Sequence, residues 1–165
     1  MNNIRIHRQR RRSMVMKRTP VGLVLFIPNW MKPNSPQVRE FIADGIAKLG
    51  MPAPASEQTR PAELRAILRE WAKRLGVKPG RVQIRDMYQK WGSCSSRGSI
   101  TLNTALCRVP RPLAEYVVLH ELVHLRVFNH GKEFKAMMSV HMPDWVERDK
   151  ALDAILHRGL DEDRS

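Results

Sequence analysis

The sequence has few cysteines and no long hydrophobic run. Its two cysteines, Cys94 and Cys107, give no disulfide framework and no CxxC pair of the kind that binds structural zinc or carries redox chemistry. The longest apolar stretch, residues 21–27, is far shorter than the roughly 20 residues that span a bilayer, and Pro28 stops it. We therefore expect a cytoplasmic protein of a reducing compartment, with no membrane partner and no secretory signal.

The first 39 residues contain no acidic residue, and the first one in the chain is Glu40. Such an uncompensated basic segment attracts nucleic acid, nucleotides or acidic surfaces, although it also serves as a plain solvated face. We therefore treat the basic N-terminal region as a candidate for nucleotide or nucleic-acid contact, although no recognised binding module accompanies it. Much of the formal net charge of +13 at pH 7 comes from this region, through Arg5, Arg8, Arg10, Arg11, Arg12, Lys17 and Arg18.

The remaining composition is typical of a folded domain, with 42% hydrophobic and 27% charged residues. We expect one domain over residues 1–158, with a basic N-terminal hairpin at about 5–28, and a polar tail over 159–165. The fold class expected is α+β, with helices around a small, mainly antiparallel sheet.

The expected elements follow from hydrophobic periodicity and from turn residues. They are a β-hairpin over 13–27 with its turn at 19–22, helices over 37–49 and 61–75 joined by a linker at 51–60, strands at 82–87 and 99–103 with a turn at 91–98 between them, and helices over 112–124, 133–140 and 144–156.

Residues 120–130 read HELVHLRVFNH, an HExxH motif with a third histidine six residues after the second. Histidines at i and i+4 project from one face of a helix, so His120 and His124 can bind one metal ion. Glu121 lies about a third of a turn round from His120, close enough to hydrogen-bond a metal-bound water without binding the metal. The motif predicts one zinc ion per chain, with Glu121 as the general base. The helix is apolar nearly all round over 117–125, so these buried polar groups need a partner such as a metal.

His130 is the expected third ligand, and Glu133 is the alternative. For His130 to reach the metal, the helix must end after His124. The glycine that usually makes this turn, in an HExxHxxGxxH pattern, is replaced by Val127. We therefore expect the break over residues 129–131, where asparagine and glycine tolerate left-handed backbone.

The motif and its flanking segments resemble the YgjP-like branch of the SprT-like zinc metallopeptidases. The flanking segments are KWGSCSSRGSITLN at 90–103 and HMPDWVERDKAL at 141–152, and the resemblance covers residues 86–152 well. The basic hairpin resembles the family's opening strands less specifically. The resemblance implies a zincin-like arrangement, with the segment 91–103 beside the metal helix. It also implies His120, His124 and His130 as metal ligands and Glu121 as catalytic base.

Two places depart from the family pattern. Lys135 follows Phe134 where the family commonly has an aromatic residue, and residues 104–106 lack a bulkier aromatic-basic pair. Both places are candidates for lining the substrate pocket.

Three further features have a functional and a structural interpretation. Cys94 is favoured as a small residue in a tight turn, because no base adjacent in sequence would activate it as a nucleophile. The strand 99–103 is either an edge that pairs with an extended peptide or an ordinary core strand. Tyr88 and Tyr116 are candidate hydrogen-bond donors in catalysis, although neither is favoured.

The leading interpretation is a zinc-dependent metallopeptidase that acts on peptide or protein substrates. One alternative is a metal-dependent pyrophosphohydrolase of nucleoside triphosphates, although phosphoryl chemistry usually uses carboxylate-rich sites. A second alternative is a basic nucleic-acid-associated domain with structural zinc, which would need a fourth protein ligand.

Overall fold

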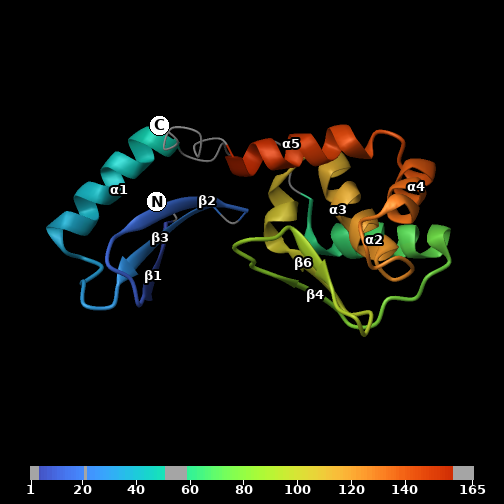
Figure 1. Cartoon of the computed structure of the whole chain (residues 1–165), viewed down its shortest axis with the longest axis horizontal. Coiled ribbons are helices and arrows are strands. Elements are labelled where there is room, and N and C mark those ends of the chain that lie inside the picture. Colours follow the sequence, from blue (N-terminus) through green and yellow to red (C-terminus); the bar gives the residue numbers. More distant parts are fainter. Residues whose placement is uncertain (1–3, 21, 51–58, 158–165) are drawn as a thin grey trace. The chain divides into compact units, whose positions relative to one another are not determined.

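The computed structural model describes residues 4–20, 22–50 and 59–157 (Figure 1). The chain divides into two compact units, residues 1–53 with 154–165 and residues 54–153. The single domain over 1–158 stays a prediction. Residue 21 of the expected turn, residues 51–58 of the expected linker and the tail 159–165 lie outside the described residues. Within the described ranges, no helix is both long and apolar enough to cross a membrane.

The first unit is a three-stranded sheet with one helix packed on it. Its strands are β1 (Arg5–Gln9), β2 (Val15–Thr19) and β3 (Gly22–Pro28), and helix α1 spans Pro36–Leu49. β2 and β3 pair antiparallel, which confirms the predicted hairpin, and β1 pairs parallel with β3. Alternate residues of β3 point to one face of the sheet, where they form the core with α1. The core residues are Met16, Leu23, Leu25, Ile27 and Val38.

The second unit holds the HExxH motif. Its three-stranded sheet has the order β4-β6-β5, with β4 parallel and β5 antiparallel to β6. The α+β class and the predicted helices are confirmed. Its elements are α2 (Pro61–Leu75), β4 (Val82–Arg85), β5 (Gly92–Cys94), β6 (Ile100–Asn103), the 3₁₀ helix η1 (Thr104–Arg108), α3 (Arg111–Val123), α4 (Lys132–His141) and the start of α5 (Trp145–His157).

The strand pairing differs from the expected single, mainly antiparallel sheet. Each unit has its own small sheet, in which the first strand pairs with the third. In each sheet the first and second strands run in opposite directions and the second and third pair antiparallel, so the first and third run parallel. Among the described residues, two of the four strand pairs are therefore parallel.

The structure corrects one expectation for the segment 91–103 and decides between the two interpretations of the strand 99–103, in favour of the ordinary core strand. The stretch 91–98 is not only a turn, because Gly92–Cys94 forms the edge strand β5. The following strand, β6, lies between β4 and β5 and is therefore no edge that a peptide can extend. Sequence patterns missed β5 because it has only three residues, one of them glycine.

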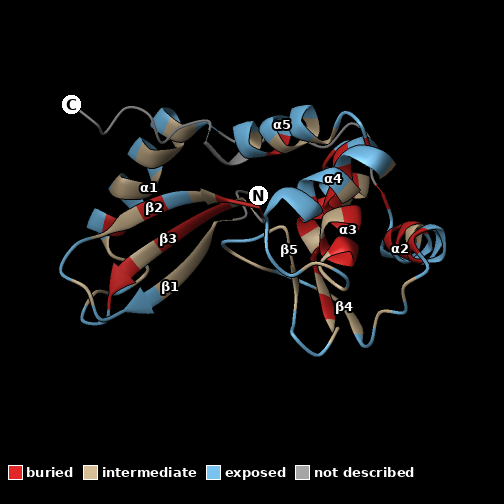
Figure 2. Cartoon of the chain, turned by 45° about the vertical axis from the view of Figure 1, so that its right-hand side comes forward, coloured by how far each residue is buried: buried red, intermediate tan, exposed pale blue. Residues whose placement is uncertain are grey.

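Helix α3 is the central element of the second unit. Figure 2 shows it buried over most of its length, and Val118, Leu119, Leu122 and Val123 are fully buried. α2, β5 and α4 all pack against it. The helix begins next to Pro110 and Pro112, which suits a first turn whose amides lack helical partners. Because other elements cover α3 on nearly all sides, apolar side chains are favoured around nearly its whole circumference.

Asn103 fixes the loop that leads into β5. This side chain is 0% exposed, and its Nδ2 donates to the carbonyls of Met87 at 2.7 Å and Lys90 at 2.8 Å. The side-chain Oδ1 of Asn103 accepts from the backbone amide of Ala105 at 3.0 Å, and the backbone amide of Asn103 donates to the Trp91 carbonyl at 2.9 Å. Through its side chain and its backbone, this one buried residue therefore ties the loop 87–91, and with it the start of β5, to the end of β6.

Candidate metal centre

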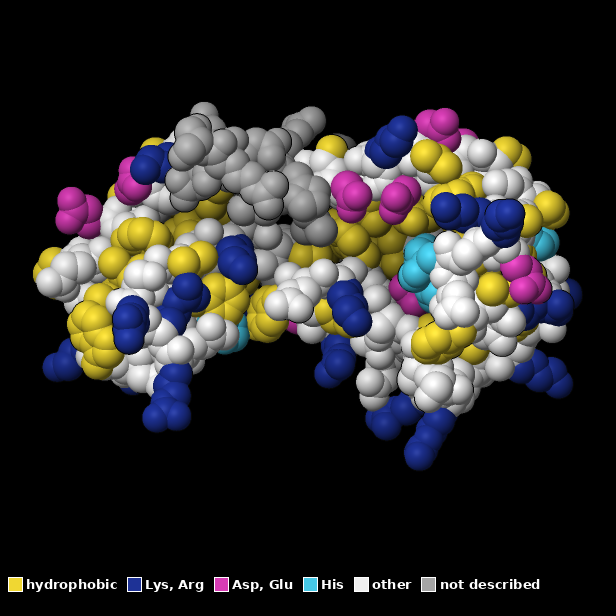
Figure 3. Space-filling view, viewed as in Figure 1, with side chains coloured by type: hydrophobic (Ala, Val, Ile, Leu, Met, Phe, Trp, Pro, Cys, Tyr) yellow, Lys and Arg dark blue, Asp and Glu magenta, His cyan; other side chains and the backbone are white. Residues whose placement is uncertain are grey.

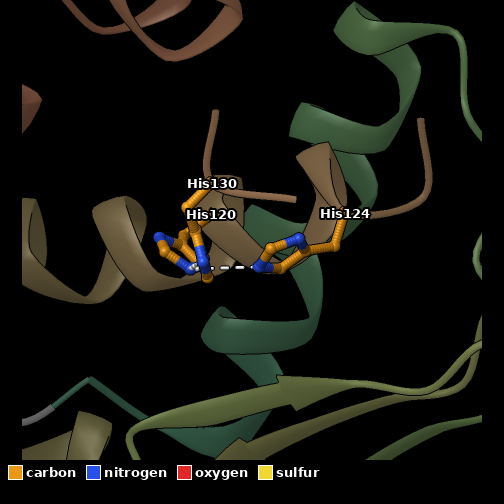
Figure 4. Close-up of side chains that lie close together, drawn as sticks. All are labelled: His120, His124 and His130. Carbon is orange, nitrogen blue, oxygen red and sulfur yellow. Dashed lines mark hydrogen bonds between the residues drawn. The ribbon is translucent and has the colours of Figure 1, made fainter. Parts of the chain in front are cut away.

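Three histidine side chains converge at the C-terminal end of α3. The Nε2 atom of His120 lies 3.2 Å from Nε2 of His124 and 3.0 Å from Nε2 of His130. Figure 4 shows the rings of His120 and His130 facing the ring of His124. The candidate ligand atoms of the three lie within 4.8 Å of one another, and the exposed Glu133 does not belong to this group. The structure therefore brings together the three histidines that the sequence singled out.

The helix ends within one residue of the expected place, but the turn after it differs from the predicted one. α3 ends at Val123, and residues 124–126 form a turn in which the amide of Leu125 donates to the Leu122 carbonyl at 3.0 Å. Gly131 has a φ of −80°, and no residue between 124 and 131 has a positive φ. The predicted break at 129–131 through left-handed backbone is therefore wrong. Hydrogen bonds of the i to i+3 type close the last turn without any special backbone conformation.

Arg126 anchors this turn to a distant helix. Its Nη2 donates to the Leu75 carbonyl at 2.7 Å and lies 3.5 Å from the Gly76 carbonyl. These groups are at the C-terminal end of α2, where carbonyls lack helical partners and a cation is favoured. Sequence reasoning missed Arg126, because nothing local indicates that α2 ends beside it.

Phe134 of α4 packs against all three histidine rings. Its ring centroid lies 4.9 Å from those of His120 and His124 and 4.7 Å from that of His130. The phenyl ring is buried, so it supports the imidazoles from the protein side. A buried ring at this position restricts the orientations that the three imidazoles can adopt.

Glu121 lies on the same helix with its carboxylate against β5. It is 6% exposed, and the backbone of Gly92 approaches it closely. A Cβ atom at Gly92 would lie 2.9 Å from Cγ and 3.0 Å from Oε1 of Glu121. Glycine is therefore required where β5 passes the carboxylate. Glu121 does not belong to the converging ligand group found among the described residues.

A cavity of about 300 Å³ opens in front of this group. Figure 3 shows histidine side chains at a hollow on the surface of the unit that contains α3. Besides the motif residues, the cavity has a cationic side chain from Lys90 and an exposed aromatic ring from Phe128. Its lining is Lys90, Gly92, Ser93, Cys94, His120, Glu121, His124, Phe128 and His130.

Burial shifts the pKa values of the titratable groups around this cavity. Burial, and then the charges of His124 and His130, lower the pKa of His120 to about 4. Burial also lowers the pKa of His124, although a hydrogen bond to the Val127 carbonyl acts in the opposite direction. Both imidazoles are therefore neutral at pH 7 in the metal-free protein, and a neutral imidazole is the form that binds a metal.

The pKa of Glu121 moves the other way. Burial raises the pKa of this carboxyl to about 7, and the charge of Lys90 opposes the rise. Burial, followed by the charge of Glu121, raises the pKa of the Cys94 thiol. Cys94 therefore stays a thiol at neutral pH, which favours the structural over the nucleophilic interpretation of this residue.

The donor set fits a divalent ion such as zinc. The Nδ1 atom of His124 lies 3.2 Å from the Val127 carbonyl, which can only accept a hydrogen bond. The ring proton is therefore on Nδ1, and the lone pair on Nε2 faces the other two imidazoles. Imidazole nitrogens are common zinc ligands. Among the described residues the group has three members, so the site has room for a further ligand from the cavity.

Comparison with known proteins decides the family. The YgjP-like, metallopeptidase domain family matches residues 55–155, which is more than half of the chain. The chain belongs to the YgjP-like metallopeptidases. The matched residues correspond closely to the second unit, residues 54–153, so we call it the metallopeptidase unit. The match does not include the N-terminal hairpin, whose resemblance to the family stays a prediction.

Two solved structures share the fold over more than half of this chain. The metallopeptidase zymogen jannalysin of Methanocaldococcus jannaschii has 24% identity and a TM-score of 0.50, over 55% of this chain and 93% of that one. The metallopeptidase zymogen abylysin of Pyrococcus abyssi has 24% identity and a TM-score of 0.52, over 58% of this chain and 97% of that one. No curated protein matches the chain. The zincin-like fold is confirmed, and the family makes this chain a metal-dependent hydrolase of the metallopeptidase type.

Proposed function

We propose that the chain is a zinc-dependent peptidase, with His120, His124 and His130 as zinc ligands and Glu121 as general base. The observation that carries this proposal is the convergence of three imidazole nitrogens at a cavity whose wall contains a buried carboxylate. Zinc held by three protein ligands acts as a Lewis acid and lets water attack an amide near neutral pH.

Glu121 has the environment that a general acid–base group needs. Its pKa of about 7 lets it accept a proton at neutral pH and give it up again within one turnover. We infer that it takes the proton of the attacking water and delivers it to the leaving amine. Gly92 keeps the carboxylate at the cavity wall, because a larger residue would fill the space that Glu121 occupies.

The edge strand β5 supports a peptide or protein as the substrate. β5 lines the cavity beside the histidines and pairs with β6 along one side. An extended peptide can add to such an edge through backbone hydrogen bonds, which recognise the chain without fixing its sequence. The exposed ring of Phe128 supplies an apolar contact for a substrate side chain at the cavity.

Replacing the base tests the proposed function. Glu121→Gln should keep about one zinc per chain and lower hydrolysis of unfolded protein by roughly 100-fold or more, because only proton transfer is lost. Zinc content is measured by metal analysis, and turnover by cleavage of a denatured protein and of unstructured peptides. Loss of zinc in this variant would make Glu121 a ligand and contradict the assignment. If the unchanged protein cleaved nucleoside triphosphates and not peptides, the nucleotide alternative would replace the peptidase.

A pair of glycine variants tests the position of the carboxylate. Gly92→Ala should keep zinc and lose at least about tenfold in turnover, because the new methyl group displaces Glu121 from the cavity wall. Gly131→Ala is the matched control, since nothing lies within 4 Å of an added Cβ there and its φ is −80°. Equal activity of the two variants would show that the contact between β5 and Glu121 is unimportant for turnover.

A second candidate function concerns one end of the sheet in the first unit. β1 and β3 run parallel, so both end where β2 begins, and the Asn29 amide donates to the Gln9 carbonyl at 3.1 Å. The segments after β1 and β3 therefore lie together. They and the end of β1 carry the exposed residues Arg8, Arg10, Arg12, Trp30 and Lys32, which we call the arginine end.

The chemistry of the arginine end suits single-stranded nucleic acid. Guanidinium groups bind phosphates, and Trp30, which is 74% exposed, offers a face on which a base can stack. The acidic residues among residues 1–50 are Glu40 and Asp44, and both are on α1. Asp44 pairs with Lys48 at 3.1 Å. On the face drawn in Figure 3, the acidic side chains of this unit accordingly lie near α1, and basic ones lie below them. We infer that the arginine end contacts nucleic acid.

Salt dependence tests this contact. Arg10→Ala with Arg12→Ala should make the log–log salt slope of binding to a labelled single-stranded oligonucleotide shallower by about 1.4, at roughly 0.7 per lost phosphate contact. Trp30→Ala should weaken binding with little change in slope, because stacking is not ionic. Arg69→Ala with Lys73→Ala, two exposed cations of α2, is the charge-matched control. If both double variants lost the same affinity and the same salt slope, the binding would depend on net charge alone and not on the arginine end.

A further inference from the structure

Tyr116 lies one helical turn before His120 and contacts the side of that imidazole that faces away from the other histidines. Its Oη is 3.3 Å from Nδ1 of His120, and the two rings meet edge to face at a centroid distance of 5.8 Å. Tyr116 is 4% exposed and does not line the cavity. The phenol is therefore placed behind the metal-facing edge of His120, where it cannot act on a substrate in the cavity.

Asp149 of α5 completes a chain of three side chains. The hydroxyl of Tyr116 donates to Oδ1 of Asp149 at 2.8 Å. A phenol has one hydrogen, so the contact with His120 leaves the Tyr116 oxygen as the acceptor and Nδ1–H of His120 as the donor.

The direction of these two hydrogen bonds determines the tautomer of His120. A neutral imidazole carries one ring proton, and a proton on Nδ1 leaves the lone pair on Nε2. That Nε2 atom is the one that lies 3.2 Å from His124 and 3.0 Å from His130. The Val127 carbonyl sets His124 in the same way, by accepting from its Nδ1 at 3.2 Å.

We propose that Tyr116 and Asp149 are positioning residues, which act in series to hold His120 in the tautomer and orientation that present Nε2 to the metal. This inference rests on the proposed role of His120 as a zinc ligand. Through Asp149, helix α5 contributes to the site, although this residue lies 33 residues beyond Tyr116 in the sequence. Acceptors behind ligand histidines commonly contribute tenfold to 100-fold in metal affinity.

Zinc affinity and the imidazole tautomer together test this proposal. Tyr116→Phe keeps the ring and removes the acceptor, so it should weaken zinc binding by the full chain about 10- to 100-fold in competition with a chelator. Asp149→Asn should weaken binding in the same direction, because a neutral amide holds the phenol hydrogen less strongly. Asp153→Asn is the matched control and should stay within about twofold. Asp153 is an exposed carboxylate on the same helix whose charge acts on Tyr116, whereas the phenol hydrogen goes to Asp149.

The second readout is the ¹⁵N spectrum of metal-free protein labelled in histidine, with the His120 signals assigned by their loss in His120→Gln. In the unchanged chain His120 should carry its proton on Nδ1, and in Tyr116→Phe the Nε2-protonated form should appear. A merely structural role of Tyr116 would not change this distribution. Unchanged zinc affinity in both variants, with the same tautomer of His120, would overturn the proposal.

The two readouts also separate this inference from the proposed function. If the unchanged chain bound no zinc, the peptidase proposal would fail, and the tautomer measured without metal would still decide the role of Tyr116. If Tyr116→Phe did not fold, the comparison of Asp149→Asn with Asp153→Asn would decide it, because both changes remove one carboxylate charge from α5.

Discussion

The metallopeptidase unit depends on a helix that is buried on nearly all sides and still carries polar side chains at one end. A buried carboxylate and buried imidazoles are costly unless each one has a partner. These groups have such neighbours in α3 itself, in the turn after it, in β5 and in α4. Gly92 leaves room for the carboxylate of Glu121, Tyr116 and a backbone carbonyl accept from two imidazoles, and Phe134 supports the rings. The Nε2 lone pairs are left facing one another, and a cation is the partner that suits them.

The geometry of the site is held by elements far apart in the sequence. Arg126 ties the turn after α3 to the end of α2, and Asn103 ties the loop before β5 to β6. α4 contributes the phenyl ring, and α5 contributes the carboxylate behind Tyr116. Residues of α2, β6, α4 and α5 therefore all contribute to the position of the metal-facing imidazoles.

The sequence predicted which histidine side chains converge better than it predicted their surroundings. The i, i+4 spacing of His120 and His124 and the apolar helix around them are local signals, and the structure brings His130 to them as expected. The turn that carries His130 back was placed too late, because ordinary backbone closes it and Arg126 anchors it from another helix. β5 was missed because a strand of three residues has no measurable alternation. The parallel pairs could not be read either, because strand order is a property of the whole sheet.

The coordination of the bound ion tests the central claim most directly. X-ray absorption at the zinc edge of the zinc-loaded full chain should give nitrogen ligands at about 2.0–2.1 Å, with the scattering pattern of three imidazoles and one further light atom. His130→Ala should reduce that pattern to two imidazoles. A sulfur ligand at about 2.3 Å, or a spectrum that His130→Ala leaves unchanged, would contradict the account.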